Sequence, residues 1–345
     1  MHMDRRRLLA LASSGLALGI AGCSEEGTIG TPDGEDEEED DPADSTATEE
    51  ASEADSSTFE LGETAVYRES DDDELAFTPR DADLKDALVY SNSSSLYSEV
   101  PDQSGRTFLR VEVEAENTGS EPVDVPADPP LTIDGKQYET TFTSAYSNSS
   151  YDQFQEIQPG ASVSGWLVYE IEPSDGTGEL IADFDQFSES TTATWRIDVG
   201  SLERETYDYP DLSAGDTLEF GTEDRRFSIG PTSVEEAQSY TYSSSDYTFE
   251  EEPDSGDKFV FVTLSAENVG DERVTVPSTF DISLIAGTSE SDVSYYSGDR
   301  TEYEGGEISP GIAREGILLF EVDESATSYE LAVELTSEIT ARWNL

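Results

Sequence analysis

The chain has 345 residues and carries 79 acidic against 18 basic side chains, which gives a formal net charge of −61 at pH 7. No basic patch is present that could neutralise phosphates, and this argues against nucleic acid as a partner. The only histidine is His2 and the only cysteine is Cys23. Beyond residue 23 the sequence therefore excludes a disulfide framework, a Ser-His-Asp triad, a Cys-His pair and histidine metal ligands, and we expect no cofactor.

Residues 1–23 are typical of an export signal. The charged start contains Arg5 and Arg6, and the apolar segment 8–20 that follows is 13 residues long. A transmembrane helix needs roughly 20 apolar residues, so this segment is too short for a permanent span. The stretch DRRRLL at 4–9 resembles a twin-arginine export signal, and the resemblance implies that the chain leaves the cytoplasm.

Cys23 ends the stretch IAGC, which resembles a lipobox. The resemblance implies that its thiol is lipidated and that Cys23 becomes the first residue of the mature protein. Two lipid chains would hold the protein stably on the membrane, whereas one chain gives only reversible binding. The alternative is that Cys23 is an incidental small residue of an ordinary signal. The expected location is the outer face of the cytoplasmic membrane, at the cell surface.

Residues 24–58 form an acidic segment with 15 acids and no base. Ile29 is its only large apolar residue, so the segment cannot bury enough surface to fold, and we expect a disordered linker. A flexible chain of this length spans roughly 30–35 Å, enough to hold a domain clear of the membrane. The alternative is a calcium-binding run, but the spaced Asp and Gly pattern of a calcium loop is missing.

The remaining chain, 59–345, is acidic and yet has the composition of a folded protein. It contains 63 acids and 15 bases, a net charge of −48, and its only lysines are Lys85, Lys136 and Lys258. At about 1 M salt the Debye length falls to about 3 Å and the repulsion among these charges is screened. The composition resembles that of proteins from extremely halophilic archaea, which implies that stability falls when salt drops below the molar range.

An internal repeat defines the domain organisation. Residues 105–126 recur at 256–277, with 11 of 22 positions identical, and 157–170 recur at 308–321 with the same offset of 151. We therefore predict a tandem duplication of a domain of about 140 residues, a usual size for one domain. The two copies are expected at 59–202 and 203–345.

Each copy consists of short strand patterns separated by turns. Residues 108–115 alternate apolar and polar, which is typical of a strand with one buried face. Asn117 and Gly119 are expected to turn this strand because both tolerate positive φ, and Pro159-Gly160 fits a type II turn. Residues 84–90 fit a helical turn or a strand, and their counterpart 233–242 favours a strand. The predicted fold is all-β, with two tandem immunoglobulin-like antiparallel β-sandwiches.

The order of these motifs resembles a telokin-like, immunoglobulin-like family of prokaryotic surface lipoproteins. The motifs are the strand that ends in Asn-x-Gly, the valine-rich return and the Pro-Gly turn before a strand with an aromatic residue and glutamate. The resemblance covers both copies. It implies an extracytoplasmic sandwich and transfers no catalytic residue, because the family has no assigned function.

Aromatic residues offer the main candidates for binding. Trp166, Trp195 and Trp343 lie in strand patterns, and we expect core positions for them rather than a sugar-stacking platform. Stretches rich in Tyr and Ser resemble binding loops, with ordinary loops as the alternative. These stretches are 90–97, 146–151, 240–247 and 295–296.

Repeated glutamates and two asparagines are further candidate site residues. The repeated carboxylates Glu116/Glu267 and Glu170/Glu321 are expected to be structural, which leaves carboxylate-pair catalysis without a candidate. Asn92 and Asn148 each begin an N-glycosylation sequon within a serine-rich loop.

These observations predict a lipid-anchored surface protein of a halophilic archaeon with a binding or structural role and no enzymatic activity. Its partners would be the membrane, through the lipid on Cys23, and a surface protein or glycan. The alternative is an accessory or solute-binding lipoprotein that delivers a ligand to a membrane complex. A two-lobed binding protein would need helices that the sequence lacks.

Overall fold

The structure is a computed structural model that describes residues 28–30, 57–68, 74–146, 149–151, 156–184, 192–209, 212–244 and 247–345. Arg5, Arg6, Cys23 and Asn148 lie outside the described residues. Within these ranges the regular elements are strands and three single-turn 3₁₀-helices, and none of them is a helix able to cross a membrane. The helices are η1 (Ser144–Tyr146), η2 (Val199–Ser201) and η3 (Thr279–Asp281).

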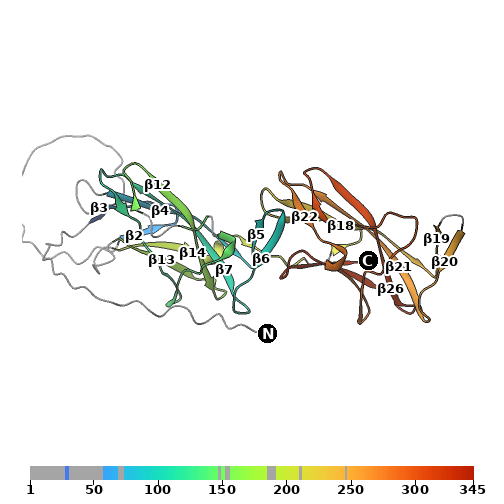
Figure 1. The fold of residues 1–345 in the computed structure, drawn as a ribbon. Helices are drawn as coiled ribbons and strands as arrows, with labels where there is room; N and C mark the ends of the chain where they lie inside the picture. The colour runs from blue at the N-terminus through green and yellow to red at the C-terminus, as the bar shows by residue number, and fades with distance from the viewer. Residues whose placement is uncertain are drawn as a thin grey trace, which may run out of the picture.

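Domain 1 is a sandwich of two sheets (Figure 1). The first sheet contains β1 (Thr28–Gly30), β3 (Ala65–Arg68), β4 (Glu74–Lys85), β7 (Thr107–Asn117) and β12 (Ser162–Ile171), in that order, with β15 (Arg204–Glu205) beside β4. The second sheet contains β10 (Lys136–Tyr138), β9 (Leu131–Ile133), β13 (Thr177–Asp183), β14 (Thr192–Asp198) and β2 (Ser57–Glu60). Two small ribbons pair β5 (Leu88–Asn92) with β6 (Ser95–Glu99) and β8 (Val123–Asp124) with β11 (Glu156–Ile157).

Domain 2 repeats this architecture. Its first sheet contains β17 (Leu218–Gly221), β18 (Arg226–Ala237), β21 (Asp257–Asn268) and β26 (Ala313–Asp323). Its second sheet contains β16 (Leu212–Ser213), β28 (Thr340–Asn344), β27 (Tyr329–Glu334), β23 (Ile282–Ala286) and β24 (Ser289–Asp292). The ribbons pair β19 (Tyr240–Ser244) with β20 (Tyr247–Glu251) and β22 (Val274–Val276) with β25 (Gly306–Ile308). The predicted all-β fold and the duplication are confirmed.

Three strand pairings differ from the predicted all-antiparallel arrangement. β2 lies parallel to β14, β16 lies parallel to β28, and β15 lies parallel to β4. In each sandwich the strand that enters the domain adds to the edge of the closing strand, which runs in the same direction. The segment predicted as a disordered linker also differs in part, because β1 pairs with β3 and β2 begins at Ser57.

The tryptophans divide between the core and the outer surface. Trp195 and Trp343 are fully buried at matching places in the two copies. Their Nε1–H groups donate to the carbonyl oxygens of Glu63 at 2.8 Å and Asp216 at 3.1 Å, which satisfies the only polar atom of each ring. The predicted core position of Trp166 is wrong. Trp166 lies half-buried on the outer face of β12, with the Arg110 guanidinium 4.2 Å from its ring centroid.

The Asn-x-Gly motif works through the asparagine side chain and not through positive φ. Neither Gly119 nor Gly270 has positive φ, so the predicted reason for this turn is wrong. The buried Asn117 carboxamide donates to the carbonyl oxygens of Glu121 at 2.7 Å and Ile157 at 2.9 Å, and it accepts from Gly119 N–H at 2.9 Å. Asn268 makes the same three bonds in domain 2, to Glu272, Ile308 and Gly270.

The same asparagines fix the Pro-Gly turns. Gly160 N–H donates to the Asn117 carbonyl oxygen at 2.9 Å, and Gly311 N–H donates to the Asn268 carbonyl oxygen at 2.9 Å. Gly160 and Gly311 have φ of +73° and +70°, as the predicted type II turns require. Two motifs some 40 residues apart in sequence therefore form one buried structural unit in each copy.

Candidate functional site

The β5–β6 hairpin of domain 1 reaches across and packs on domain 2 (Figure 1). Val89 and Leu96 contact the hydrophobic core of domain 2, together with the buried Ala87. Thr275 N–H donates to the Ser94 carbonyl oxygen at 2.7 Å, and the Ser98 and Thr336 hydroxyls are 2.6 Å apart. This hairpin joins the two sandwiches into one body.

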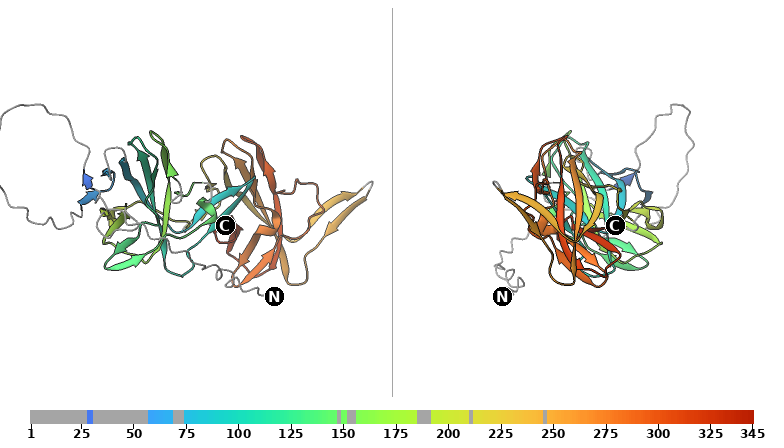
Figure 2. Two further views of the ribbon diagram at one scale, coloured as in Figure 1. Left: turned by 60° about the vertical axis from the view of Figure 1, so that its left-hand side comes forward. Right: turned by 90° about the vertical axis from the view of Figure 1, so that its right-hand side faces the viewer.

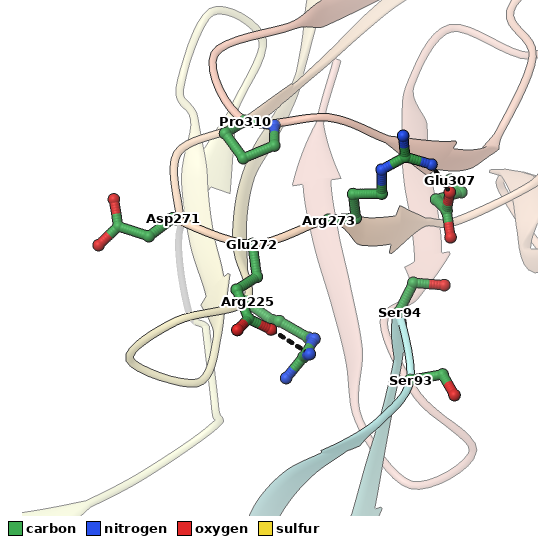
Figure 3. A pocket seen from close by; sticks show the side chains of 8 residues that line it. All are labelled: Ser93, Ser94, Arg225, Asp271, Glu272, Arg273, Glu307 and Pro310. Carbon is green, nitrogen blue, oxygen red and sulfur yellow. Dashed lines mark hydrogen bonds and ion pairs between the residues drawn. The ribbon is translucent and has the colours of Figure 1, made fainter.

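A groove of about 490 Å³ lies beside this joint (Figure 3). Arg225 is ion-paired with Glu272, and Arg273 Nη1 lies 2.7 Å from Glu307 Oε1. The hydrogen bond from Arg273, and then one from Ser94, lowers the pKa of Glu307. Because Ser93 and Ser94 of the docked β5–β6 hairpin form part of its wall, the groove is explained as part of the joint rather than as a binding site.

The opposite end of domain 2 carries the β19–β20 hairpin, which projects away from domain 1 (Figures 1 and 2). Strand alternation and register place Tyr240 and Tyr242 on one face of β19, opposite Glu251 and Phe249 of β20. The rings of Tyr242 and Phe249 stack with centroids 5.2 Å apart, and the centroid of Tyr247 is 6.5 Å from that of Phe249. Tyr247 is 72% exposed and Phe249 is 44% exposed.

At the base of this hairpin the rings continue into a pocket of about 450 Å³. The Tyr240 ring lies 5.0 Å from Tyr296 and 5.8 Å from Phe261, measured between centroids, and all three line the pocket. We call the six residues that share this surface the aromatic strip: Tyr240, Tyr242, Tyr247, Phe249, Phe261 and Tyr296. The strip runs from a sheltered pocket to an exposed hairpin tip.

Charged groups border the pocket. Arg300 Nη1 lies 2.7 Å from Glu235 Oε2, and the Arg300 guanidinium lies 5.1 Å from the Phe261 ring centroid. The backbone N–H of Arg300 donates to the Tyr296 hydroxyl at 3.3 Å, which holds the loop over the ring. Asp299 completes the border of the pocket. The site thus combines aromatic faces with hydrogen-bonding groups of both kinds, donors and acceptors.

The corresponding surface of domain 1, around Arg110, lacks the aromatic strip. Arg110, at the position of Phe261, pairs with Asp83 at 2.7 Å and stacks on Trp166. Domain 2 keeps the acid as Glu235, directly opposite Phe261 in the sheet, and draws its arginine from a loop. Moving the guanidinium from strand to loop leaves an aromatic wall on the sheet.

The other strip positions also differ between the copies. By strand register, Tyr240 and Tyr247 stand where domain 1 has Leu88 and Ser95. Of the described residues in the corresponding loop of domain 1, Ala145 is the one that packs on the matching cluster, in the place of Tyr296.

The sequence-predicted aromatic stretches separate into different places. Stretches 240–247 and 295–296 come together at the base of the β19–β20 hairpin, whereas 90–97 lies at the joint and Tyr151 of 146–151 is buried in the domain 1 core. Phe249, Phe261, Arg300 and Glu235 were missed. The repeat alignment did hold a signal for one of them, because it sets Phe261 against Arg110.

The remaining predicted residues have these positions. Asn92 is exposed at the end of β5, beside the joint. Glu170 accepts a hydrogen bond from Asp102 N–H at 3.1 Å, and Glu321 accepts one from Asp254 N–H, so both hold the loop before a long strand. Among the described residues there is no group of three or more potential metal ligands.

Several solved structures align with parts of this chain. A candidate lipoprotein of Bacillus subtilis matches with 19% identity and a TM-score of 0.28 over 38% of this chain and 39% of that one, so this chain spans about two fifths of its length. A β-sandwich protein of Clostridium difficile matches with 16% identity and a TM-score of 0.30, over 44% and 99% of the two chains. The secreted protein MPT63 of Mycobacterium tuberculosis matches with 15% identity and a TM-score of 0.29, over 40% and 98%.

No curated protein matches the sequence. One family model, described as a domain of unknown function, DUF4352, matches residues 60–192 and again residues 224–341, which together are well over half of the chain. Each match falls on one of the two sandwiches. The chain therefore belongs to the DUF4352 family and carries two copies of its domain.

Proposed function

We propose that this protein is a lipid-anchored surface protein of a halophilic archaeon that presents the aromatic strip to a partner outside the membrane. Its role is binding and not catalysis. The observation that carries the proposal is the exposure of aromatic rings at the end of domain 2 that faces away from domain 1 and its entering strand β2.

The position of the strip fits a tether at the other end of the chain. The lipobox-like Cys23 precedes domain 1, and the edge strand β1 of that domain begins five residues after it, at Thr28. The joint between the domains fixes the second sandwich beyond the first. A partner approaching from outside would meet the β19–β20 hairpin before any other part of the described chain.

Concentrated salt favours a binding site made of aromatic rings over one made of charged groups. At molar salt, charge attraction between exposed groups is screened within about 3 Å. Burial of aromatic surface and direct hydrogen bonds still operate under these conditions. A partner site built mainly of rings therefore suits a protein whose surface charge requires concentrated salt.

The anchor is tested by Cys23→Ser in cells of a haloarchaeal host. The variant is expected in the medium or as unprocessed precursor, while the unaltered protein sediments with membranes. A Cys23→Ser protein that stays on membranes at mature size would contradict lipid anchoring through this residue.

The strip is tested by capture from native cell envelopes at molar KCl. The full chain is compared with a Tyr247→Ser/Phe249→Ser variant, which removes the two exposed rings without touching the sheet core. The matched control is Tyr97→Ser, because Tyr97 occupies the place of Phe249 in the first hairpin and is equally 44% exposed. Loss of captured material with the double variant and not with the control is expected. Equal capture by all three proteins would overturn the proposed role of the strip.

A further inference from the structure

We propose that the aromatic strip binds a neutral polysaccharide, with sugar rings lying along the β19–β20 hairpin and one of them entering the pocket. This rests on the proposed function and names the class of partner.

The duplication serves as an internal control for the rings. Cross-strand stacking alone is common to both hairpins, since Tyr90 and Tyr97 stack at 5.6 Å just as Tyr242 and Phe249 stack at 5.2 Å. That pair is a structural feature of the ribbon. In addition to this shared pair, domain 2 has Tyr240, Tyr247, Phe261 and Tyr296 on the same surface. The corresponding described positions of domain 1 are not aromatic, so the duplicated fold does not require these four rings.

The size of the hairpin favours a slender ligand. Five paired residues span about 17 Å and two strands are about 10 Å wide, so one face offers about 170 Å². A stable protein–protein interface needs about 800 Å² on each partner. The face is therefore too narrow for a globular protein, but it accommodates a single extended chain such as a polysaccharide.

The groups around the rings select a hydroxyl-rich, uncharged ligand. Sugars present apolar C–H faces that lie on aromatic rings and hydroxyls that need both donors and acceptors. Glu235, Asp299 and the Tyr240 hydroxyl supply acceptors at the pocket, and Arg300 supplies donors in a planar fork.

Carboxylates at the site disfavour an anionic ligand. Glu251 lies on the ring-bearing face of β20, opposite Tyr240, and Asp299 lies at the pocket. Molar salt screens charges beyond about 3 Å, so these carboxylates act only on a group in direct contact with them. A phosphate or carboxylate of an anionic polysaccharide lying on the rings would make such a contact.

The test divides one native envelope preparation into two portions. The first is digested with a nonspecific protease, which leaves polysaccharide, and the second is oxidised with periodate, which cleaves vicinal diols and leaves protein. Binding of the full chain to each immobilised portion is measured at molar KCl. Binding is expected to survive proteolysis and to be lost after periodate. Tyr247→Ser/Phe249→Ser should weaken binding to the digested portion at least about tenfold, and Tyr97→Ser should leave it unchanged.

Each other outcome has a distinct meaning. Binding that survives periodate and is lost on proteolysis overturns the polysaccharide and leaves the strip as a site for an extended peptide. Binding to the digested portion that both variants retain overturns the strip as the sugar site. Absence of strip-dependent binding to untreated envelopes overturns the proposed function itself.

Discussion

The two hairpins of this protein are the same element in two settings. β5–β6 follows the long strand β4 and β19–β20 follows the long strand β18, and each hairpin has five paired positions and a stacked aromatic pair. Their other faces differ. Val89, Leu96 and Ser98, which contact domain 2, correspond by register to Thr241, Thr248 and Glu250.

This difference shows why one hairpin docks and the other does not. Threonine and glutamate leave β19–β20 without the apolar docking face that β5–β6 has, while its aromatic face is kept and enlarged. The first hairpin is a joint and the second is free to bind.

The largest expected effect tests what the two copies share. Asn117→Ala and Asn268→Ala each remove three side-chain hydrogen bonds inside a sandwich and leave buried backbone groups without partners. Each substitution is expected to lower the free energy of unfolding of its own domain by about 4 kcal/mol. Chemical denaturation at molar KCl measures this loss. A much smaller loss in one copy would show that the asparagine unit is not equivalent in the two domains.

The next prediction compares the docked β5–β6 hairpin with the exposed β19–β20 hairpin. Val89→Asp places a charge in the contact with the domain 2 core, whereas Thr241→Asp places it at the corresponding position in solvent. The first is expected to destabilise the protein by about 3 kcal/mol and to separate the melting of the two domains, and the second to change stability by less than about 0.5 kcal/mol. Differential scanning calorimetry at molar KCl distinguishes them. Equal effects would mean that the first hairpin is not docked in solution.

A smaller effect compares the stacked pairs. Tyr97→Ala and Phe249→Ala each remove one ring of a cross-strand pair that is 44% exposed. Both are expected to cost about 1 kcal/mol or less, to the same extent. Thermal melts give the costs. A markedly larger cost for Phe249→Ala would assign that ring to folding rather than to binding.

The smallest effect concerns a charge cluster that domain 2 alone possesses. The Tyr329 hydroxyl, 2.5 Å from Glu236 Oε1, and then Lys258, 2.9 Å from Oε2, hold the pKa of Glu236 below its usual value of 4.5. A depressed carboxyl pKa contributes stability above pH 4.5 that is lost as pH falls through the lowered pKa. Glu236→Gln should therefore flatten the acid side of the stability profile of domain 2. An unchanged difference between the two proteins from pH 7 to pH 3 would contradict this.

The sequence was sufficient for the architecture because the duplication doubles every strand signal. The Pro-Gly turns and the positions of Trp195 and Trp343 followed from local pattern. The role of Asn117 did not, because one of its partners, Ile157, lies 40 residues away on β11. Local pattern likewise did not show that the edge strands β2 and β16 pair in parallel.

The binding site was only partly visible for a related reason. Tyr240 and Tyr296 belong to predicted aromatic stretches, but nothing local shows that strand β19 and a loop some 55 residues later meet on the Phe261 ring. Strand alternation alone places Phe261 on the outer face of the first sheet of domain 2, opposite Glu235. The pocket exists because Arg300 returns over that surface from a loop whose course the sequence does not specify.

The docked hairpin also sets an order of assembly. Ala87, Val89 and Leu96 belong to the hydrophobic core of domain 2, although they precede its first strand by more than 100 residues. Synthesis proceeds from the N-terminus, so this apolar ribbon exists before the strands that cover it. Domain 1 thus offers a preformed surface on which the second sandwich can complete its folding. A domain 2 released without it would begin with an apolar gap at its joint end.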